Sequence, residues 1–133
     1  MLAANDGLAN SVISAETARK LKYVPVTGQD ATAAGIQHIL AGQQCMTVYK
    51  AVKKEADAAS KLAIALSKGT QPPAGLVNGK TNDTARDVPS VLLTPQAITK
   101  DNVKVVFDDG FLKPSDVCVG KYATLCQQAG ISG

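Results

Sequence analysis

Three polar residues of different chemistry, Asn5, Asp30 and Lys50, each follow a short apolar stretch of the sequence. Asp30 comes shortly after the β-branched run at 24–27, and Lys50 directly follows the apolar run at 45–49. In a sheet of parallel strands, ligands bind beyond the carboxyl ends of the strands. The spacing therefore predicts that an amide, a carboxylate and an ammonium group meet at one binding edge.

Each of these residues also has a purely structural interpretation. Asp30 is placed to cap a helix, Asn5 is a common turn residue, and Lys50 fits a solvated lysine at a strand end. Capping and ligand binding are compatible for Asp30, because a carboxylate has two oxygens. Acid–base work by Asp30 or Lys50 in an α/β enzyme is a further alternative.

The remaining reactive residues do not form a pattern typical of catalysis or metal binding. The sequence has no nucleophile–base pair and no phosphate-binding glycine loop, and its single histidine, His38, is far from the cysteines. A zinc site needs more ligands at closer spacing. Cys45 is interpreted as an inert buried thiol in a strand, and His38 as a surface or boundary residue. We therefore expect no enzyme activity, no metal and no cofactor.

Cys118 and Cys126 are the better candidates for a disulfide. Eight positions apart on one continuous helix, they would be separated by about 12 Å, whereas a disulfide needs Cα atoms within about 7 Å. Gly120 allows the chain to fold back, so we expect Cys118 to precede the last helix and to pair with Cys126. A disulfide would imply an oxidising compartment, and a free core thiol is the alternative.

Composition and charge exclude several classes of protein. The 133 residues carry a formal charge of +3, with 45% apolar and 19% charged residues, which is ordinary for a globular domain. The lysines form no basic stripe with interleaved aromatic residues, so we expect no nucleic-acid partner. No apolar run approaches the length of a membrane-spanning helix, and the first residues lack the pattern of a signal peptide.

Helical and strand-like patterns alternate along the chain. The order predicts an α/β fold, with a mainly parallel sheet and flanking helices. A long polar loop is expected over 70–87. Helices are expected from an Asp6 cap to about Lys20, from an Asp30 cap to Gly42, over 52–69, over 101–108 and over 121–129; strands are expected over 24–27, 45–49 and 88–94.

Three of these helices have a predicted apolar face, which in the second helix consists of Ala33, Ile36, Ile39 and Leu40. In the first, the apolar stripe is Leu8, Val12 and Ala15. The helix over 52–69 has the clearest pattern, with charged residues on the opposite side. Its predicted buried face consists of Val52, Ala56, Ala59, Ala63 and Leu66.

Three segments carry a resemblance to a known family. The segments 3–9, 24–50 and 87–103 contain AANDGLA, VPVTGQDATAAGIQHILAGQQCMTVYK and DVPSVLLTPQAITKDNV. They resemble the C-terminal portion of the xylose-binding proteins, which are type I periplasmic binding proteins of ABC sugar importers. GQDA and MTVYK are specific together, whereas AANDG is shared with ribose- and galactose-binding relatives and with sugar-responsive repressors. The likeness ends in the loop over 70–86 and in the cysteine-containing tail.

The resemblance implies two Rossmann-like lobes with the sugar between them. Asn5, Asp30 and Lys50 match sugar-contacting positions of the family, where charged and amide groups suit hydroxyls that both donate and accept. Family sites also hold the sugar between aromatic rings. This chain has no Trp, so the residues that set the sugar's identity are expected elsewhere. In lobe terms, 1–43 and 95–133 are assigned to the C-terminal lobe, and 44–94 largely to the N-terminal lobe.

The resemblance also implies partners and a location. A xylose-like pentose is the expected ligand, and an ABC transporter permease is the expected receiver of that ligand. The missing N-terminal half of the protein, or a second copy of the chain, is expected to cover apolar surface. The parent protein is expected to be extracytoplasmic, in the periplasm or as a cell-surface lipoprotein. The alternative is the effector-binding core of a sugar-responsive regulator, which shares the fold.

Overall fold

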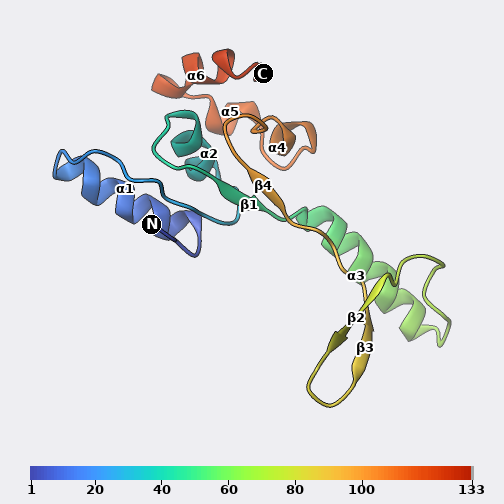
Figure 1. The fold of residues 1–133 in the computed structure, drawn as a ribbon. Coiled ribbons are helices and arrows are strands. Elements are labelled where there is room, and N and C mark those ends of the chain that lie inside the picture. Colours follow the sequence, from blue (N-terminus) through green and yellow to red (C-terminus); the bar gives the residue numbers. More distant parts are fainter. Residues whose placement is uncertain (133) are drawn as a thin grey trace. The chain divides into compact units, whose positions relative to one another are not determined.

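The computed structural model describes residues 1–132 and divides into two compact units (Figure 1). The first unit combines Met1–Lys50 with the chain from Pro95 onward, and the second unit is Ala51–Thr94. Segment 44–50 therefore lies in the first unit. The assignment of these segments to lobes of a larger protein stays a prediction.

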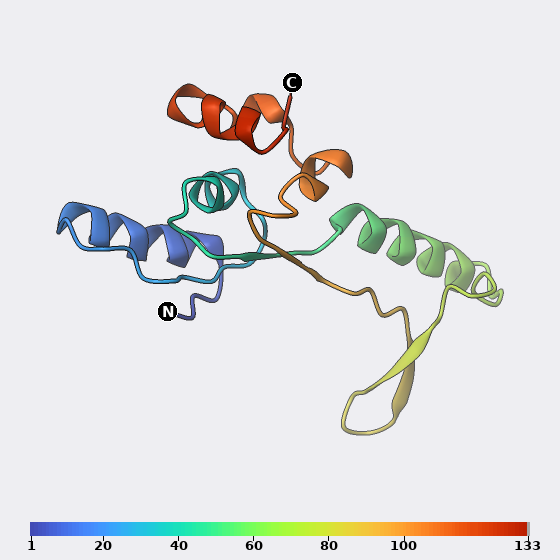
Figure 2. The ribbon, with the colours of Figure 1, turned by 45° about the horizontal axis from the view of Figure 1, so that its top comes forward.

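The elements of each unit follow the expected alternation only in part (Figures 1 and 2). The second unit contains α3 (Val52–Ser67), β2 (Gly79–Asn82) and β3 (Asp87–Ser90). The first unit contains α1 (Asp6–Ala18), α2 (Ala33–Leu40), β1 (Thr47–Tyr49), β4 (Gln96–Ile98), α4 (Val105–Asp108), α5 (Pro114–Val117), a 3-10 turn η1 (Gly120–Tyr122) and α6 (Ala123–Gln128).

The caps of the first two helices differ from those expected. Asn5, not Asp6, caps α1, because its Oδ1 accepts the Leu8 N–H at 2.9 Å. Thr32, not Asp30, caps α2 through its hydroxyl, which accepts the Gly35 N–H at 3.0 Å. Both aspartates precede or begin a helix, but their carboxylates are engaged with residues distant in sequence.

Asp6 is a buried carboxylate of the first unit and is only 2% exposed. Its Oδ1 accepts hydrogen bonds from Gln44 Nε2 and the Thr47 hydroxyl, both at 2.8 Å. Its Oδ2 accepts from the Thr32 N–H at 2.8 Å and from the Thr32 hydroxyl at 3.0 Å. The start of α1, the start of α2 and the strand β1 are therefore joined through one carboxylate. The first unit also buries these apolar side chains: Ala9, Ile13, Val26, Ile36, Ile39, Leu40, Ile98, Val103 and Val106.

The expected parallel sheet is present only as fragments. The paired strands are antiparallel: β1 pairs with β4 and β2 pairs with β3. Segment 24–27 is not a strand, yet Thr27 donates to the Met1 carbonyl at 3.1 Å. Asp30 N–H donates to the Val48 carbonyl at 2.9 Å, and Val48 N–H donates to the Gly28 carbonyl at 3.2 Å, as in a parallel ladder. Pro25 has no N–H to donate, so the ladder stays short.

The second unit corrects two expectations. The predicted loop over 70–87 contains β2 and the turn of a β-hairpin, and β3 is shorter than the predicted strand over 88–94. In the hairpin turn, the Asp83 carboxylate accepts the N–H groups of Arg86 at 2.8 Å and Ala85 at 3.0 Å. These backbone hydrogen bonds hold the pKa of Asp83 below its ordinary value.

The buried face of α3 is also not the predicted one. Ala58 and Ala65 are buried and Leu62 is half-buried, whereas Val52 is 52% and Leu66 is 70% exposed. Ala58 and Leu62 line a groove of about 470 Å³, together with residues of and after β3. The predicted face, Val52, Ala56, Ala59, Ala63 and Leu66, is exposed throughout. In α1 the stripe is also displaced, because Ala9 and Ile13 are buried while Leu8 is exposed.

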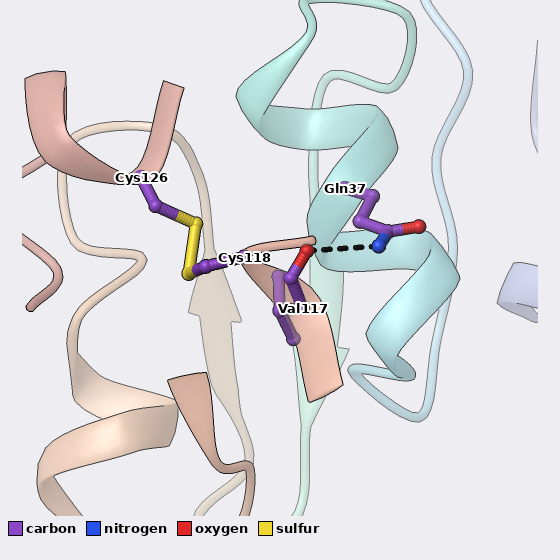
Figure 3. Close-up of a disulfide and its surroundings, with 4 residues drawn as sticks. All are labelled: Gln37, Val117, Cys118 and Cys126. Atoms are coloured by element: carbon purple, nitrogen blue, oxygen red, sulfur yellow. Dashed lines mark hydrogen bonds between the residues drawn. A yellow bond between two sulfur atoms is a disulfide. The ribbon is translucent and has the colours of Figure 1, made fainter. Parts of the chain in front are cut away.

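The C-terminal tail contains the expected disulfide. Cys118 follows α5 and bonds to Cys126 in α6, with Cα atoms 5.7 Å apart. Gly120 reverses the chain between them with φ +55°, where glycine has no Cβ penalty. Gln37 Nε2 of α2 donates to the Val117 carbonyl at 2.9 Å, which fastens this tail to the rest of the first unit (Figure 3). Within residues 1–132, no helix has the length and apolar character of a membrane span.

Two glycines lie against the Asp6 carboxylate because no side chain fits there. A Cβ added to Gly35 would lie 2.1 Å from Asp6 Oδ2, and one added to Gly28 would lie 2.1 Å from Asp6 Oδ1. Glycine to alanine in a helix usually stabilises a protein by about 0.5–1 kcal/mol. At Gly35 the overlap with the carboxylate reverses that sign.

We therefore expect Gly35→Ala to lower the free energy of unfolding by about 1–3 kcal/mol, the usual range for overpacking. Chemical denaturation followed by circular dichroism measures it. Gly7→Ala is the matched control, because its new Cβ meets only Asn5 Oδ1, at an ordinary 3.4 Å. Equal stability of the two variants would contradict the tight packing around Asp6.

Candidate functional site

The structure places two of the three predicted site residues in direct contact. Lys50 Nζ lies 2.9 Å from Asp30 Oδ1, and the side chains are 36% and 45% exposed. Exposed ion pairs of this kind contribute little to stability. The pair therefore matters mainly because it places a carboxylate and an ammonium group side by side at an accessible edge of the first unit.

Asn5 reaches the same neighbourhood through the backbone. The next residue, Asp6, donates its N–H to the carbonyl of Gln29, adjacent to Asp30, at 2.9 Å. The Asn5 oxygen is occupied as the cap of α1. Among the described residues its exposed Nδ2 group has no acceptor, so the amide can cap the helix and donate to a ligand at once.

The backbone at Asp30 has an unusual conformation. Asp30 and Ala31 have φ values of +94° and +49°. This left-handed region is uncommon for residues other than glycine, and such residues cluster at ligand sites and switch regions. Nothing in the sequence signalled this, since neither residue is a glycine. The conformation ends the segment that runs beside β1 and directs the chain into α2.

Tyr49 supports the strand end just before Lys50, and its partners come from the C-terminal region. Its ring lies 5.0 Å from the Phe111 ring, centroid to centroid, and its hydroxyl donates to Asp109. The side chain was expected in the core and is 5% exposed. Burial first, and then the hydrogen bond to Asp109, raise the pKa of Tyr49 from 10.0 to about 12. Sequence reasoning missed Asp109 and Phe111, which no local pattern links to Tyr49.

Cys45 and His38, the other reactive side chains considered from the sequence, each have hydrogen-bond partners. Cys45 was expected to be buried in the strand, but it is exposed and precedes β1, with its thiol donating to the Val26 carbonyl at 3.0 Å. The ring nitrogens of His38 lie 2.9 Å from Gln43 Oε1 and 3.0 Å from Asn10 Oδ1. Among residues 1–132, no group of three potential metal ligands is present.

Comparison with known proteins identifies the type of protein to which the edge at Asp30 and Lys50 belongs. The chain is 42% identical over 119 residues to the D-xylose-binding periplasmic protein of Escherichia coli (strain K12), a match that covers 88% of this chain and 35% of that protein. It is 40% identical over 113 residues to the protein of the same name from Haemophilus influenzae, covering 84% and 33%. The chain is homologous to D-xylose-binding periplasmic proteins. It spans about a third of the length of these curated relatives.

A solved structure of a carbohydrate-binding protein also resembles this chain. The carbohydrate transporter solute-binding protein of Chloroflexus aurantiacus, determined in complex with D-glucose, superposes with a TM-score of 0.76 at 38% identity. The match covers 86% of this chain and 34% of that structure. The type I fold expected from the resemblance is thereby confirmed as a partial α/β domain. No family model matches the chain.

The raised pKa of Tyr49 has a measurable consequence. A group whose pKa is higher in the folded protein stabilises the fold below its unfolded pKa and loses that contribution as the pH rises through the folded value. We therefore expect Tyr49 to ionise late, near pH 12, with stability falling between pH 10 and 12. Titration of tyrosinate absorbance in the ultraviolet follows this, and Tyr49→Phe should remove the late step. A titration curve unchanged by Tyr49→Phe would contradict it.

Proposed function

We propose that this chain forms part of the sugar site of an extracytoplasmic solute-binding protein that delivers a pentose such as xylose to an ABC transporter permease. The Asp30–Lys50 ion pair at an accessible edge carries the proposal, and Asn5 adds an Nδ2 group that has no acceptor among the described residues. Homology to D-xylose-binding proteins supports it. In this proposal the protein is a binding protein and has no enzymatic role.

The three side chains offer complementary hydrogen-bonding groups to a sugar. A sugar hydroxyl is both donor and acceptor, so one hydroxyl can donate to the Asp30 carboxylate while accepting from the Lys50 ammonium. Hydrogen bonds to ionised groups are the stronger kind. The ion pair holds both side chains in place before the sugar arrives, which lowers the ordering cost of binding. Asn5 adds a neutral donor.

The sugar's identity depends on groups beyond these three residues. Two relatives are named for D-xylose, and a structural neighbour holds D-glucose. D-glucose differs from D-xylose by one hydroxymethyl group, while the ring hydroxyls are shared. Side chains that pair with ring hydroxyls bind either sugar, and a steric limit at the hydroxymethyl position selects between them. We assign that limit to the part of the relatives that this chain does not span.

Transport is favoured over the regulatory alternative by two observations. The curated relatives are periplasmic proteins by name. The disulfide between Cys118 and Cys126 fits an oxidising compartment, whereas an effector-binding core of a transcriptional regulator works in the reducing cytosol.

The exposed face of α3 supports a polypeptide partner. Val52 and Leu66 are each more than half exposed on this helix, and they lie on one exposed stripe with Ala56, Ala59 and Ala63. Contiguous apolar surface of this kind commonly marks an interface. Because the chain spans about a third of its relatives, we propose that the remaining region of the protein covers this face. In isolation a second copy takes that place.

The site is tested by calorimetric titration with D-xylose of a complete solute-binding protein that carries this chain. We expect Asp30→Ala to weaken binding by about 1.5–3 kcal/mol, the range for losing a hydrogen bond to a charged group. Asn5→Ser keeps a capping oxygen and removes the amide donor, so it separates binding from helix stability. Asp57→Ala is the control, because it breaks the exposed Lys53–Asp57 pair on α3. Unchanged affinity in both site variants would rule the site out.

The proposed partner face is tested by light scattering on the isolated chain. We expect association that increases with concentration, and weaker association after Leu66→Gln. That side chain is 70% exposed, so its replacement leaves the fold of the second unit intact. A monodisperse monomer at high concentration would contradict the proposal that a polypeptide partner packs on the exposed face of α3.

A further inference from the structure

The Asp30–Ala31 turn requires support, because neither residue is a glycine and both have positive φ. Backbone of this kind persists only where the surrounding structure over-determines it. The turn also sets the direction of the Asp30 carboxylate, which reaches Lys50 at 2.9 Å. The residues that fix the turn therefore fix one half of the candidate site.

Three consecutive backbone N–H groups of the turn are held by acceptors from elsewhere in the first unit. Asp30 N–H donates to the Val48 carbonyl at 2.9 Å. Ala31 N–H donates to the Thr47 hydroxyl at 3.2 Å, and Thr32 N–H donates to Asp6 Oδ2 at 2.8 Å. The Thr47 hydroxyl, having accepted from Ala31, donates in turn to Asp6 Oδ1 at 2.8 Å. Two of the three anchors thus lead back to one carboxylate.

We infer that Asp6, acting through Thr32 and Thr47, is the positioning residue of the candidate sugar site. Asp6 is 2% exposed, so its carboxylate is not open to a ligand. It holds the left-handed turn that aims Asp30 at Lys50. The consequence for sugar rests on the proposed function, whereas the effect on the Asp30–Lys50 pair does not.

The chemistry of this position calls for a carboxylate. Both oxygens of an ionised Asp accept, so Asp6 takes two hydrogen bonds on each. An asparagine would turn an NH₂ group towards donors on one side. Asp6→Asn is therefore expected to disturb the turn, and if it fails to fold, a substitution at Thr47 isolates a single link. Thr47→Val keeps the shape and removes the hydroxyl, and Thr47→Ser keeps the hydroxyl.

The test uses zero-length carbodiimide cross-linking of the whole chain, followed by mass spectrometry. The reagent joins a carboxylate and an amine in contact as an amide and takes up the water released. It therefore reports the Asp30–Lys50 contact without any sugar. The Lys53–Asp57 pair, 2.7 Å apart on α3, is an internal control in the second unit. Yields are compared at a temperature where every variant is folded.

We expect Thr47→Val to lower the Asp30–Lys50 yield several-fold relative to Lys53–Asp57, and Thr47→Ser to restore it. Amide hydrogen exchange at Ala31 should accelerate in parallel, by about fivefold for a lost hydrogen bond near 1 kcal/mol. A Thr47→Val protein that is less stable but cross-links like the wild type would overturn the inference, because the Asp6–Thr47 link would then be purely structural.

A second measurement separates this inference from the proposed function. If the wild type binds D-xylose, Thr47→Val should bind about tenfold more weakly, equivalent to about 1.4 kcal/mol, and Thr47→Ser should bind normally. Equal affinity in Thr47→Val would count against positioning. If the wild type binds no sugar, the proposed function fails, and the cross-linking result still decides whether Asp6 positions Asp30.

Discussion

A buried carboxylate with no cationic partner among the described residues organises the first unit. Removing an ionised group from water is costly unless hydrogen bonds replace its hydration, and Asp6 obtains four of them from Thr32, Gln44 and Thr47. These donors begin α2, precede β1 and lie within β1. Each segment therefore depends on the others, since the loss of any donor leaves a buried charge less solvated.

The sequence predicted where the three longest helices lie and which cysteines pair, but it did not predict the helix caps or the buried faces of α1 and α3 correctly. Local patterns located α1, α2 and α3, because amphipathic spacing is a property of neighbouring residues, whereas the predicted caps of α1 and α2 were wrong. Local patterns could not show that the Asp6 carboxylate accepts hydrogen bonds from Thr32 and Thr47, which lie 26 and 41 positions away in the sequence. In the alanine-rich α3, similar residues occur on several faces, and the packed face, Ala58 and Ala65, was one position from the predicted one.

The positions of strand ends in the sequence predicted which charged residues of the candidate site are neighbours, but not the backbone conformation that orients them. The rule that ligands bind beyond the carboxyl ends of strands predicted Asp30 and Lys50 as neighbours, because Lys50 directly follows β1 and Asp30 lies on the adjacent segment. The left-handed conformation of Asp30 was not predictable, since it results from hydrogen bonds to distant residues. The same holds for Tyr49, whose hydroxyl partner lies 60 residues later.

The first unit is discontinuous in sequence, since Met1–Lys50 and the chain from Pro95 onward enclose Ala51–Thr94. The chain must therefore close a long loop, at a cost in entropy, before the contacts between β1 and β4 can form. This order slows the folding of the first unit. The equilibrium cost depends only weakly on loop length: doubling the enclosed segment adds about 0.6 kcal/mol. Insertions and deletions between Lys50 and Pro95 therefore change the stability of the first unit only slightly. The length of the chain can vary most freely in this segment.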